Sequence, residues 1–277
     1  MVHGAAREVL VTGGEGTLRL IDDGADAVGR LGAWTGLLWI TALPSRLLFA
    51  LLCVRLLELG ADATQYADFL RRLAYAALSA WLVSLWGRQV FVRACKHALQ
   101  SERPPPRSLL RVPPRELAGY LVAALFVEAL FWALFLTFVA PVALLVGAGL
   151  AAAASGRAGP GPLEALRELG RSVGPAMRLV RLLIVFAFAL GFAAINLHAF
   201  FRFGLWLASG LAGLDTTGWD AVLGWQNPLY RVLIATGAAM LLEPIWLAAL
   251  TVHVELLRSR SSGDDLRRWF AELRSRT

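Results

Sequence analysis

The chain alternates between long apolar runs and short polar segments in which arginine is frequent. The apolar runs cover residues 33–57, 69–92, 117–139, 141–154, 180–210 and 229–257. A helix of about 20 apolar residues crosses the hydrocarbon core of a bilayer, and most of these runs reach that length. The pattern therefore predicts an all-α fold, a polytopic membrane helical bundle of about six spans.

Shorter amphipathic segments lie between the apolar runs. In the first, apolar residues recur at helical spacing on one predicted face: Leu18, Ile21, Ala25, Val28 and Leu31. Further segments of this kind are Ser108–Leu117, Leu163–Val173 (with Leu163, Leu166 and Leu169 on one side) and Asp264–Arg274. We expect them to be interfacial helices on the cytoplasmic side. The first three each precede a pair of spans, which predicts three hairpins.

Clusters of arginine set the predicted orientation of the spans. One cluster occupies residues 88–115, a second residues 157–181, and a third the tail that follows residue 257. Because basic loops remain on the cytoplasmic side, we expect both termini in the cytoplasm and a tight hairpin over 117–154 with its turn near Ala140 and Pro141. One long tilted helix over 117–154 is the alternative reading.

The composition of the chain supports this membrane assignment and favours lipid headgroups over nucleic acid as partners. Hydrophobic residues make up 57% of the chain and charged residues 17%, against about 25% charged residues in an average soluble domain. We therefore expect an N-terminal segment (1–32), one transmembrane domain (33–257) and a basic tail (258–277) in a bacterial inner membrane, with the first span as an uncleaved targeting signal. The net charge of +7 fits anionic headgroups better than nucleic acid, because the arginines flank apolar runs.

Ionisable residues inside the apolar runs are the candidates for a functional site, because burying a charge in lipid is costly. We select Glu243, Glu128, Arg46, Arg202 and His198. Glu243 and Glu128 could form a polar site with Arg46 or Arg202; structural ion pairs, or side chains reaching out from span ends, are the alternative. Glu243 stands out because Pro244 follows it and leaves a carbonyl one turn earlier without its helical hydrogen bond.

Motifs for catalysis and for cofactors are missing from the chain. It contains no zinc-protease helix motif, no nucleophile elbow and no P-loop. Cys53 and Cys95 are far apart in sequence and have no neighbouring histidine pair at ligand spacing. We therefore expect no enzyme activity, no cofactor and no metal.

Local sequence patterns resemble a family of uncharacterised multi-pass bacterial inner-membrane proteins that are encoded beside membrane-anchored transglutaminase-like proteins and AAA-type ATPases. The matching pieces are LRLIDDGADAVGRLG, ALPSRLLFALL, LVSLWGRQVFVRACKHAL and HVELLRSRSSGDDLRRWF. In the last piece, His253, Glu255 and the 261–266 segment replace the aromatic-rich start and Glu-Gly-Phe-Asp-Leu of the family. The layout is also similar to the membrane domain of some glycerophosphodiester phosphodiesterases. Neither resemblance implies a catalytic residue.

Two functions follow as hypotheses. The first is a non-enzymatic scaffold or assembly partner of an envelope-associated complex, because catalytic motifs are missing and arginine-rich helices suit headgroups or a cytoplasmic protein partner. The alternative is a transporter or lipid-handling protein that uses Glu243 and Glu128 around a central cavity.

Overall fold

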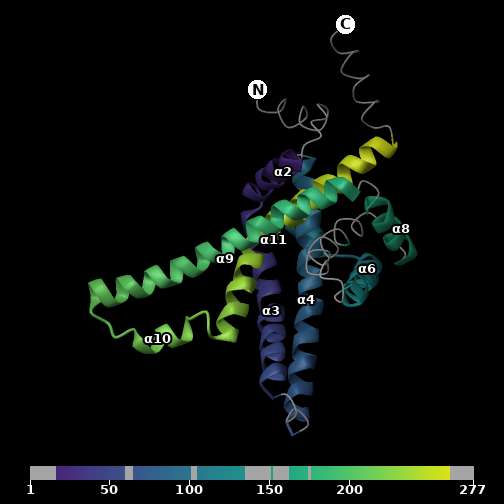
Figure 1. The fold of residues 1–277 in the computed structure, drawn as a ribbon. Helices are drawn as coiled ribbons and strands as arrows, with labels where there is room; N and C mark the ends of the chain where they lie inside the picture. Colours follow the sequence, from purple (N-terminus) through teal and green to yellow (C-terminus); the bar gives the residue numbers. More distant parts are fainter. Residues whose placement is uncertain are drawn as a thin grey trace. The chain divides into compact units, whose positions relative to one another are not determined.

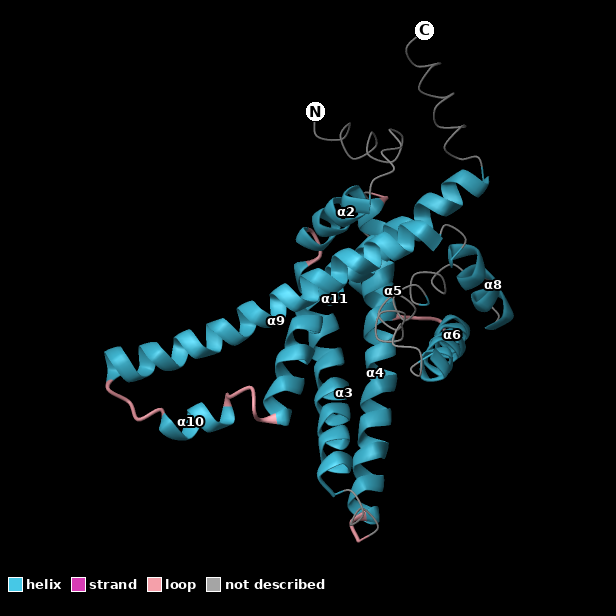
Figure 2. Ribbon diagram, viewed as in Figure 1, coloured by secondary structure: helices cyan, strands magenta, loops and turns pink. Residues whose placement is uncertain are grey.

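All regular secondary structure in the described part of the chain is helical (Figures 1 and 2). The computed structural model describes residues 17–59, 65–100, 105–134, 151, 162–173 and 176–262. The helices are α2 (Thr17–Gly29), α3 (Gly32–Leu59), α4 (Ala67–Leu99), α5 (Pro106–Leu110), α6 (Pro114–Leu134), α8 (Pro162–Val173), α9 (Ala176–Ala212), α10 (Thr217–Val222) and α11 (Pro228–Ser262). The all-α prediction is confirmed over these residues.

Within the described residues, 3 helical segments are long and apolar enough to cross a membrane, namely Gly32–Leu56, Arg178–Ala212 and Pro228–Ser259. They match the predicted runs 33–57, 180–210 and 229–257. The predicted run 69–92 lies in α4, which is helical but is not among these candidate spans. The run 117–139 lies only partly in α6, and 141–154 falls outside the described residues except for Ala151. The six-span layout and the hairpin over 117–154 stay predictions.

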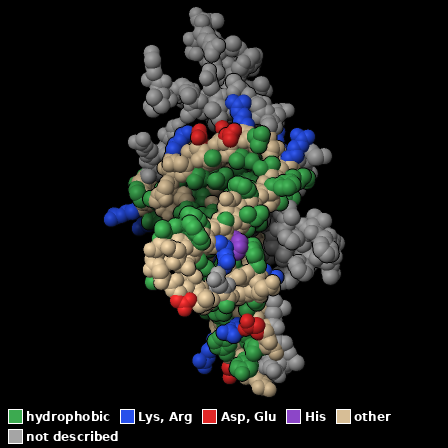
Figure 3. Space-filling view, turned by 60° about the vertical axis from the view of Figure 1, so that its left-hand side comes forward, with side chains coloured by type: hydrophobic (Ala, Val, Ile, Leu, Met, Phe, Trp, Pro, Cys, Tyr) green, Lys and Arg blue, Asp and Glu red, His purple; other side chains and the backbone are tan. Residues whose placement is uncertain are grey.

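Large apolar side chains are exposed along the candidate spans, as expected of helices that face lipid. On α9 the exposed fractions are 76% for Phe188, 72% for Phe192 and 66% for Ile195. These residues lie four and three positions apart, so they share one face of the helix. On the face drawn in Figure 3, hydrophobic side chains likewise cover broad areas of the described surface. Exposed apolar area of this extent is rare on soluble monomers and marks a membrane or protein interface.

The chain divides into two compact units. Unit 1 comprises Met1–Gly36, Arg88–Ile184 and Pro244–Thr277, and unit 2 comprises Leu37–Gly87 and Val185–Glu243. Helices α3, α4, α9 and α11 contribute residues to both units.

In unit 1, α2 packs closely against α11. A Cβ atom added to Gly24 would lie 2.8 Å from the backbone nitrogen of Ala249. The buried face of α2 is formed by Leu20, Gly24 and Ala27, whereas the predicted face began at Leu18, which is 68% exposed. An interfacial helix turns its apolar face to lipid, so the exposure of Leu18 leaves the predicted face a prediction. The closest approach of α2 to α11 is set by the missing side chain of Gly24.

Helix α8 packs against α6 and also buries a small residue. Ala165 and Leu169 are buried, while Leu163, which was predicted to lie on one side with Leu166 and Leu169, is 79% exposed. A small residue such as alanine lets neighbouring helices approach closely. The predicted single helix over Ser108–Leu117 is wrong, because α5 ends at Leu110 and α6 begins at Pro114. Pro113 and Pro114 explain the break, since proline lacks the backbone N–H that continues a helix.

In unit 2, glycine residues again mark where helices touch. Gly87 of α4 faces the side chain of Thr41 on α3, and a Cβ at Gly237 of α11 would lie 2.8 Å from Leu197 of α9. Pro44 lies inside α3 and leaves the carbonyl of Ile40 without its helical donor. The hydroxyl of the next residue, Ser45, donates to the carbonyl of Ala42 at 2.8 Å.

The Gly24 contact is tested by replacing it with alanine. We expect Gly24→Ala to lower the apparent Tm in detergent, because an overpacked contact costs about 1–3 kcal/mol and exceeds the gain in helix propensity of roughly 1 kcal/mol. The control is Gly29→Ala in the same helix, where a Cβ meets nothing within 4 Å and the Tm should be unchanged or higher. Equal Tm values for the two variants would contradict the close contact.

Candidate functional site

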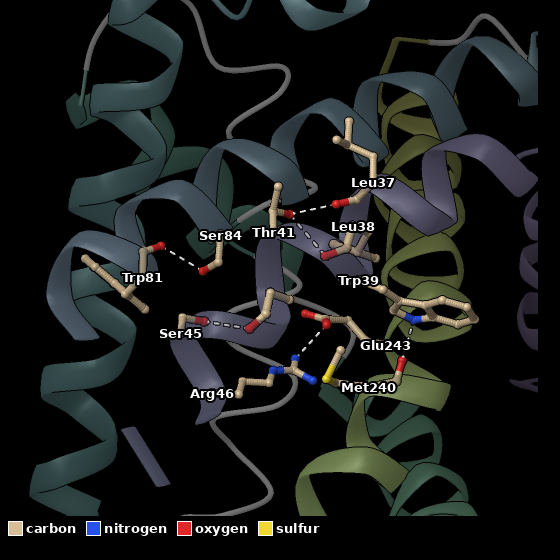
Figure 4. Close-up of polar contacts among 11 residues, drawn as sticks. Leu37, Leu38, Trp39, Thr41, Ser45, Arg46, Trp81, Ser84, Met240 and Glu243 are labelled. Atoms are coloured by element: carbon tan, nitrogen blue, oxygen red, sulfur yellow. Dashed lines mark hydrogen bonds and ion pairs between the residues drawn. The ribbon is translucent and has the colours of Figure 1, made fainter. Parts of the chain in front are cut away.

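Glu243, the strongest candidate from the sequence, forms an ion pair with Arg46 in unit 2. Nη2 of Arg46 on α3 donates to Oε2 of Glu243 on α11 at 2.6 Å (Figure 4). The side chains are 19% and 7% exposed, respectively. A charge-assisted hydrogen bond of this length is among the stronger contacts in proteins. The structure thus joins two of the predicted residues across two candidate spans.

A second contact between α3 and α11 lies beside the ion pair. Pro244 has no backbone N–H, so it cannot donate to the carbonyl of Met240 four residues earlier. The indole Nε1 of Trp39 donates to this carbonyl oxygen at 2.8 Å (Figure 4). The sequence predicted an unbonded carbonyl in α11, and the structure supplies its donor from α3. Where helices face lipid, no water is available to replace such a donor.

The two contacts share one face of each helix. Trp39 and Arg46 are seven residues apart, which is close to two helical turns. Met240 and Glu243 are three residues apart and lie on neighbouring turns of α11. A slip of one residue between the helices would break both contacts at once. The pair of contacts therefore fixes the register of α3 against α11.

The hydroxyl groups near this site bond within their own helices. Thr41 donates to the carbonyls of Leu37 and Leu38 at 2.9 and 3.0 Å, and Ser84 donates to that of Trp81 at 2.7 Å. Serine and threonine in helices commonly satisfy themselves in this way. Figure 4 shows these bonds to the helix backbone as dashed lines.

His198 and Arg202 belong to a different group of side chains in unit 2. Nδ1 of His198 lies 2.8 Å from the hydroxyl of Tyr230, and its ring centroid lies 4.8 Å from that of Trp225. Arg202 is exposed and follows His198 by four residues, one helical turn further along α9. The rings touch one another directly, which is the usual geometry of a packed aromatic cluster. We interpret this group as packing between α9 and α11.

One selected candidate, Glu128, and a further histidine of α11, His253, lie outside these two groups of side chains. Glu128 lies on α6, but its side chain is outside the described ones, so a shared site of Glu128 and Glu243 stays a prediction. His253 is fully buried in unit 1, and its Nε2 lies 3.2 Å from the carbonyl oxygen of Ser172 near the end of α8. The last carbonyls of a helix lack partners within it, so this contact caps α8.

Sequence reasoning missed Trp39, Tyr230 and Ser172 as parts of these contacts. It did predict the free carbonyl of Met240, which lies four residues before Pro244. The other partners depend on which helices become neighbours. No local pattern in the sequence marks them.

Among the described residues, no group of three or more His, Cys, Asp or Glu side chains is placed to hold a metal ion. Comparison of the chain with protein-family models, curated proteins and solved structures finds no match. The resemblance to inner-membrane proteins of transglutaminase-like gene neighbourhoods therefore stays a prediction.

The ion pair is tested by neutralising one partner. We expect Glu243→Gln to lower the apparent Tm strongly, because leaving a buried charge uncompensated costs about 3–5 kcal/mol. The control is Glu58→Gln, which neutralises an exposed pair with Arg55 on the same helix α3 and should cost about 0–1 kcal/mol. A Glu243→Gln effect no larger than the control would show that the buried pair does not hold the helices.

The Trp39 contact is tested by a double-mutant cycle. Trp39→Phe removes the donor and should destabilise the protein by about 0.5–1.5 kcal/mol, the net contribution of a typical hydrogen bond. Pro244→Ala restores the N–H that bonds Met240 within α11, so Trp39→Phe should cost less in that background. Thermal unfolding of the four proteins measures the coupling. Additive effects would show that Trp39 does not replace the donor that Pro244 lacks.

Proposed function

We propose that the chain is an integral protein of a bacterial inner membrane that acts as a non-enzymatic scaffold or assembly partner of an envelope-associated complex. The main supporting observation is the ion pair of Glu243 with Arg46, in which Nη2 of Arg46 lies 2.6 Å from Oε2 of Glu243. A carboxylate held in this way contributes to helix packing, whereas a catalytic or transport site needs a group that can reach its substrate.

The proposal includes about six spans with both termini in the cytoplasm. The basic clusters support this orientation, because positively charged loops are retained on the cytoplasmic side. The segment between α9 and α11 contains Asp215 and Asp220 and no basic residue, as suits a loop on the opposite side.

The exposed face of α9 supports an assembly role as well as lipid contact. Its apolar residues Phe188, Phe192 and Ile195 project from a helix of 37 residues, which at 1.5 Å per residue exceeds a hydrocarbon core of about 30 Å. A helix this long has apolar surface beyond the lipid tails unless it tilts strongly. Neighbouring apolar helices of a partner would cover that surface.

The test is affinity capture from native membranes in mild detergent, with the wild-type chain and with Arg46→Met combined with Glu243→Met. Replacing both charges by apolar groups of similar size is expected to preserve stability, because no buried charge is left alone. A scaffold should therefore capture the same partners, in the same ratio, with both proteins.

Two results would count against the proposal. Recovery of the wild-type chain without a reproducible partner argues against an assembly role. Loss of capture by the double variant, with its Tm intact, would assign the ion pair a chemical role of the kind a transporter or lipid-handling protein requires. Glu243→Met alone serves as the unstable comparison, because it leaves Arg46 without its carboxylate.

A further inference from the structure

A group of basic side chains lies where α4, α5 and α6 meet in unit 1. Nη1 of Arg93 on α4 donates to the backbone carbonyl of Arg111 at 2.9 Å, which places the end of α4 against the link between α5 and α6. Arg107 and Arg115 lie on either side of that link, in α5 and in the first turn of α6. We call Arg93, Lys96, Arg107, Arg111 and Arg115 the basic cluster.

The cluster exposes its guanidinium groups. Arg107, Arg111 and Arg115 are exposed, whereas Arg93 and Lys96 are half-buried. Within the described part of the chain, the three exposed arginines have no carboxylate in salt-bridge contact. The surface therefore combines strong positive charge with hydrogen-bond donors that remain available.

The carboxylate of Glu116 is the acidic neighbour of this cluster. It is half-buried, and burial raises its pKa, while the positive charges of Arg93 and Lys96 lower it. Oε1 of Glu116 is buried and makes no hydrogen bond within the described part of the chain, so this oxygen is turned away from the surface. The three exposed arginines are left to act on an external anion.

Proline residues hold the cluster in place. Pro105 and Pro106 begin α5, and Pro113 and Pro114 separate it from α6. Proline fixes one backbone torsion, so the segment loses little freedom when a ligand binds. A preorganised set of donors is suited to binding a ligand.

The surface next to the cluster is apolar. Helix α6 continues from Arg115 into a run whose Leu125 and Phe126 are 49% and 53% exposed. Basic residues at the end of an exposed apolar helix lie at the depth of the phosphate groups in a bilayer. Nucleic acid would gain nothing from the apolar continuation.

We propose that the basic cluster binds the phosphate groups of anionic phospholipids at the cytoplasmic surface. The inference rests on the membrane placement in the proposed function and specifies a lipid partner for it. Guanidinium groups suit this ligand, because their fork of N–H donors matches two phosphate oxygens at once. Bound headgroups would also brace the junction of α4, α5 and α6.

The test measures stabilisation of the full-length protein in neutral detergent by added lipid. Phosphatidylglycerol should raise the apparent Tm more than phosphatidylcholine, since a ligand that binds the folded state stabilises it. The triple variant Arg107→Gln, Arg111→Gln, Arg115→Gln should bind phosphatidylglycerol roughly a hundredfold more weakly, from the loss of three surface charges. Glu116→Gln removes the acidic neighbour and should bind this lipid more tightly.

The matched control removes three exposed arginines elsewhere, by Arg55→Gln, Arg71→Gln and Arg72→Gln in unit 2. It lowers the net charge equally and should keep the response to phosphatidylglycerol. Equal weakening in both triple variants would overturn the proposal, because net charge alone would explain the binding. Equal stabilisation by the two lipids would overturn it as well.

Two further ligands distinguish other sources of phosphate. Glycerol phosphate should stabilise the protein far less than the intact lipid, and an equal effect would identify a site for a soluble phosphate compound. A larger shift with a short duplex DNA would point to nucleic acid and overturn the lipid assignment. No protein partner is added in this test, so a failure of phosphatidylglycerol to stabilise the protein does not decide the scaffold role. Affinity capture of partners tests that role separately.

Discussion

Proline at position 244 imposes a constraint that the neighbouring helix has to meet. It removes one N–H from α11 and so frees the carbonyl of Met240, one turn before a carboxylate. In an apolar environment, both a free carbonyl and an unpaired charge cost several kcal/mol. Helix α3 supplies Trp39 to the carbonyl and Arg46 to the carboxylate, at 2.8 and 2.6 Å. The free carbonyl and the carboxylate of α11 therefore favour one position of α3 beside it.

The same constraint affects what Glu243 can do. A carboxylate within an apolar span is ordinarily a candidate for transport or proton transfer. Here its charge is balanced by a guanidinium that approaches from a fixed direction, and the arrangement sets helix register. Buried polar contacts are best documented in this specifying role. This is why we favour a scaffold over a transporter.

Close approach of helices at glycine residues is the second feature that positions the helices. Gly24 lies against the backbone of α11, and Gly237 lies against the side chain of Leu197. Gly29 has open space around it. Between apolar helices in lipid there is little hydrophobic gain from association, so close van der Waals packing at small residues gains importance. Glycine therefore marks an interface only where a partner helix is present.

The sequence alone determined the helical class and the positions of three candidate spans. Apolar runs at 33–57, 180–210 and 229–257 correspond to the described candidate spans, because helix formation and apolar length are properties of consecutive residues. It also determined that Pro244 would free a carbonyl, since that follows from the covalent structure of proline.

The tertiary structure decided which residues meet. Arg46 and Arg202 were equally available to Glu243 from the sequence, and only the placement of α3 beside α11 selected Arg46. The buried faces of α2 and α8 centre on Gly24 and Ala165, where the apolar pattern favoured Leu18 and Leu163. Periodicity describes one helix at a time, whereas burial depends on how closely a second helix can approach.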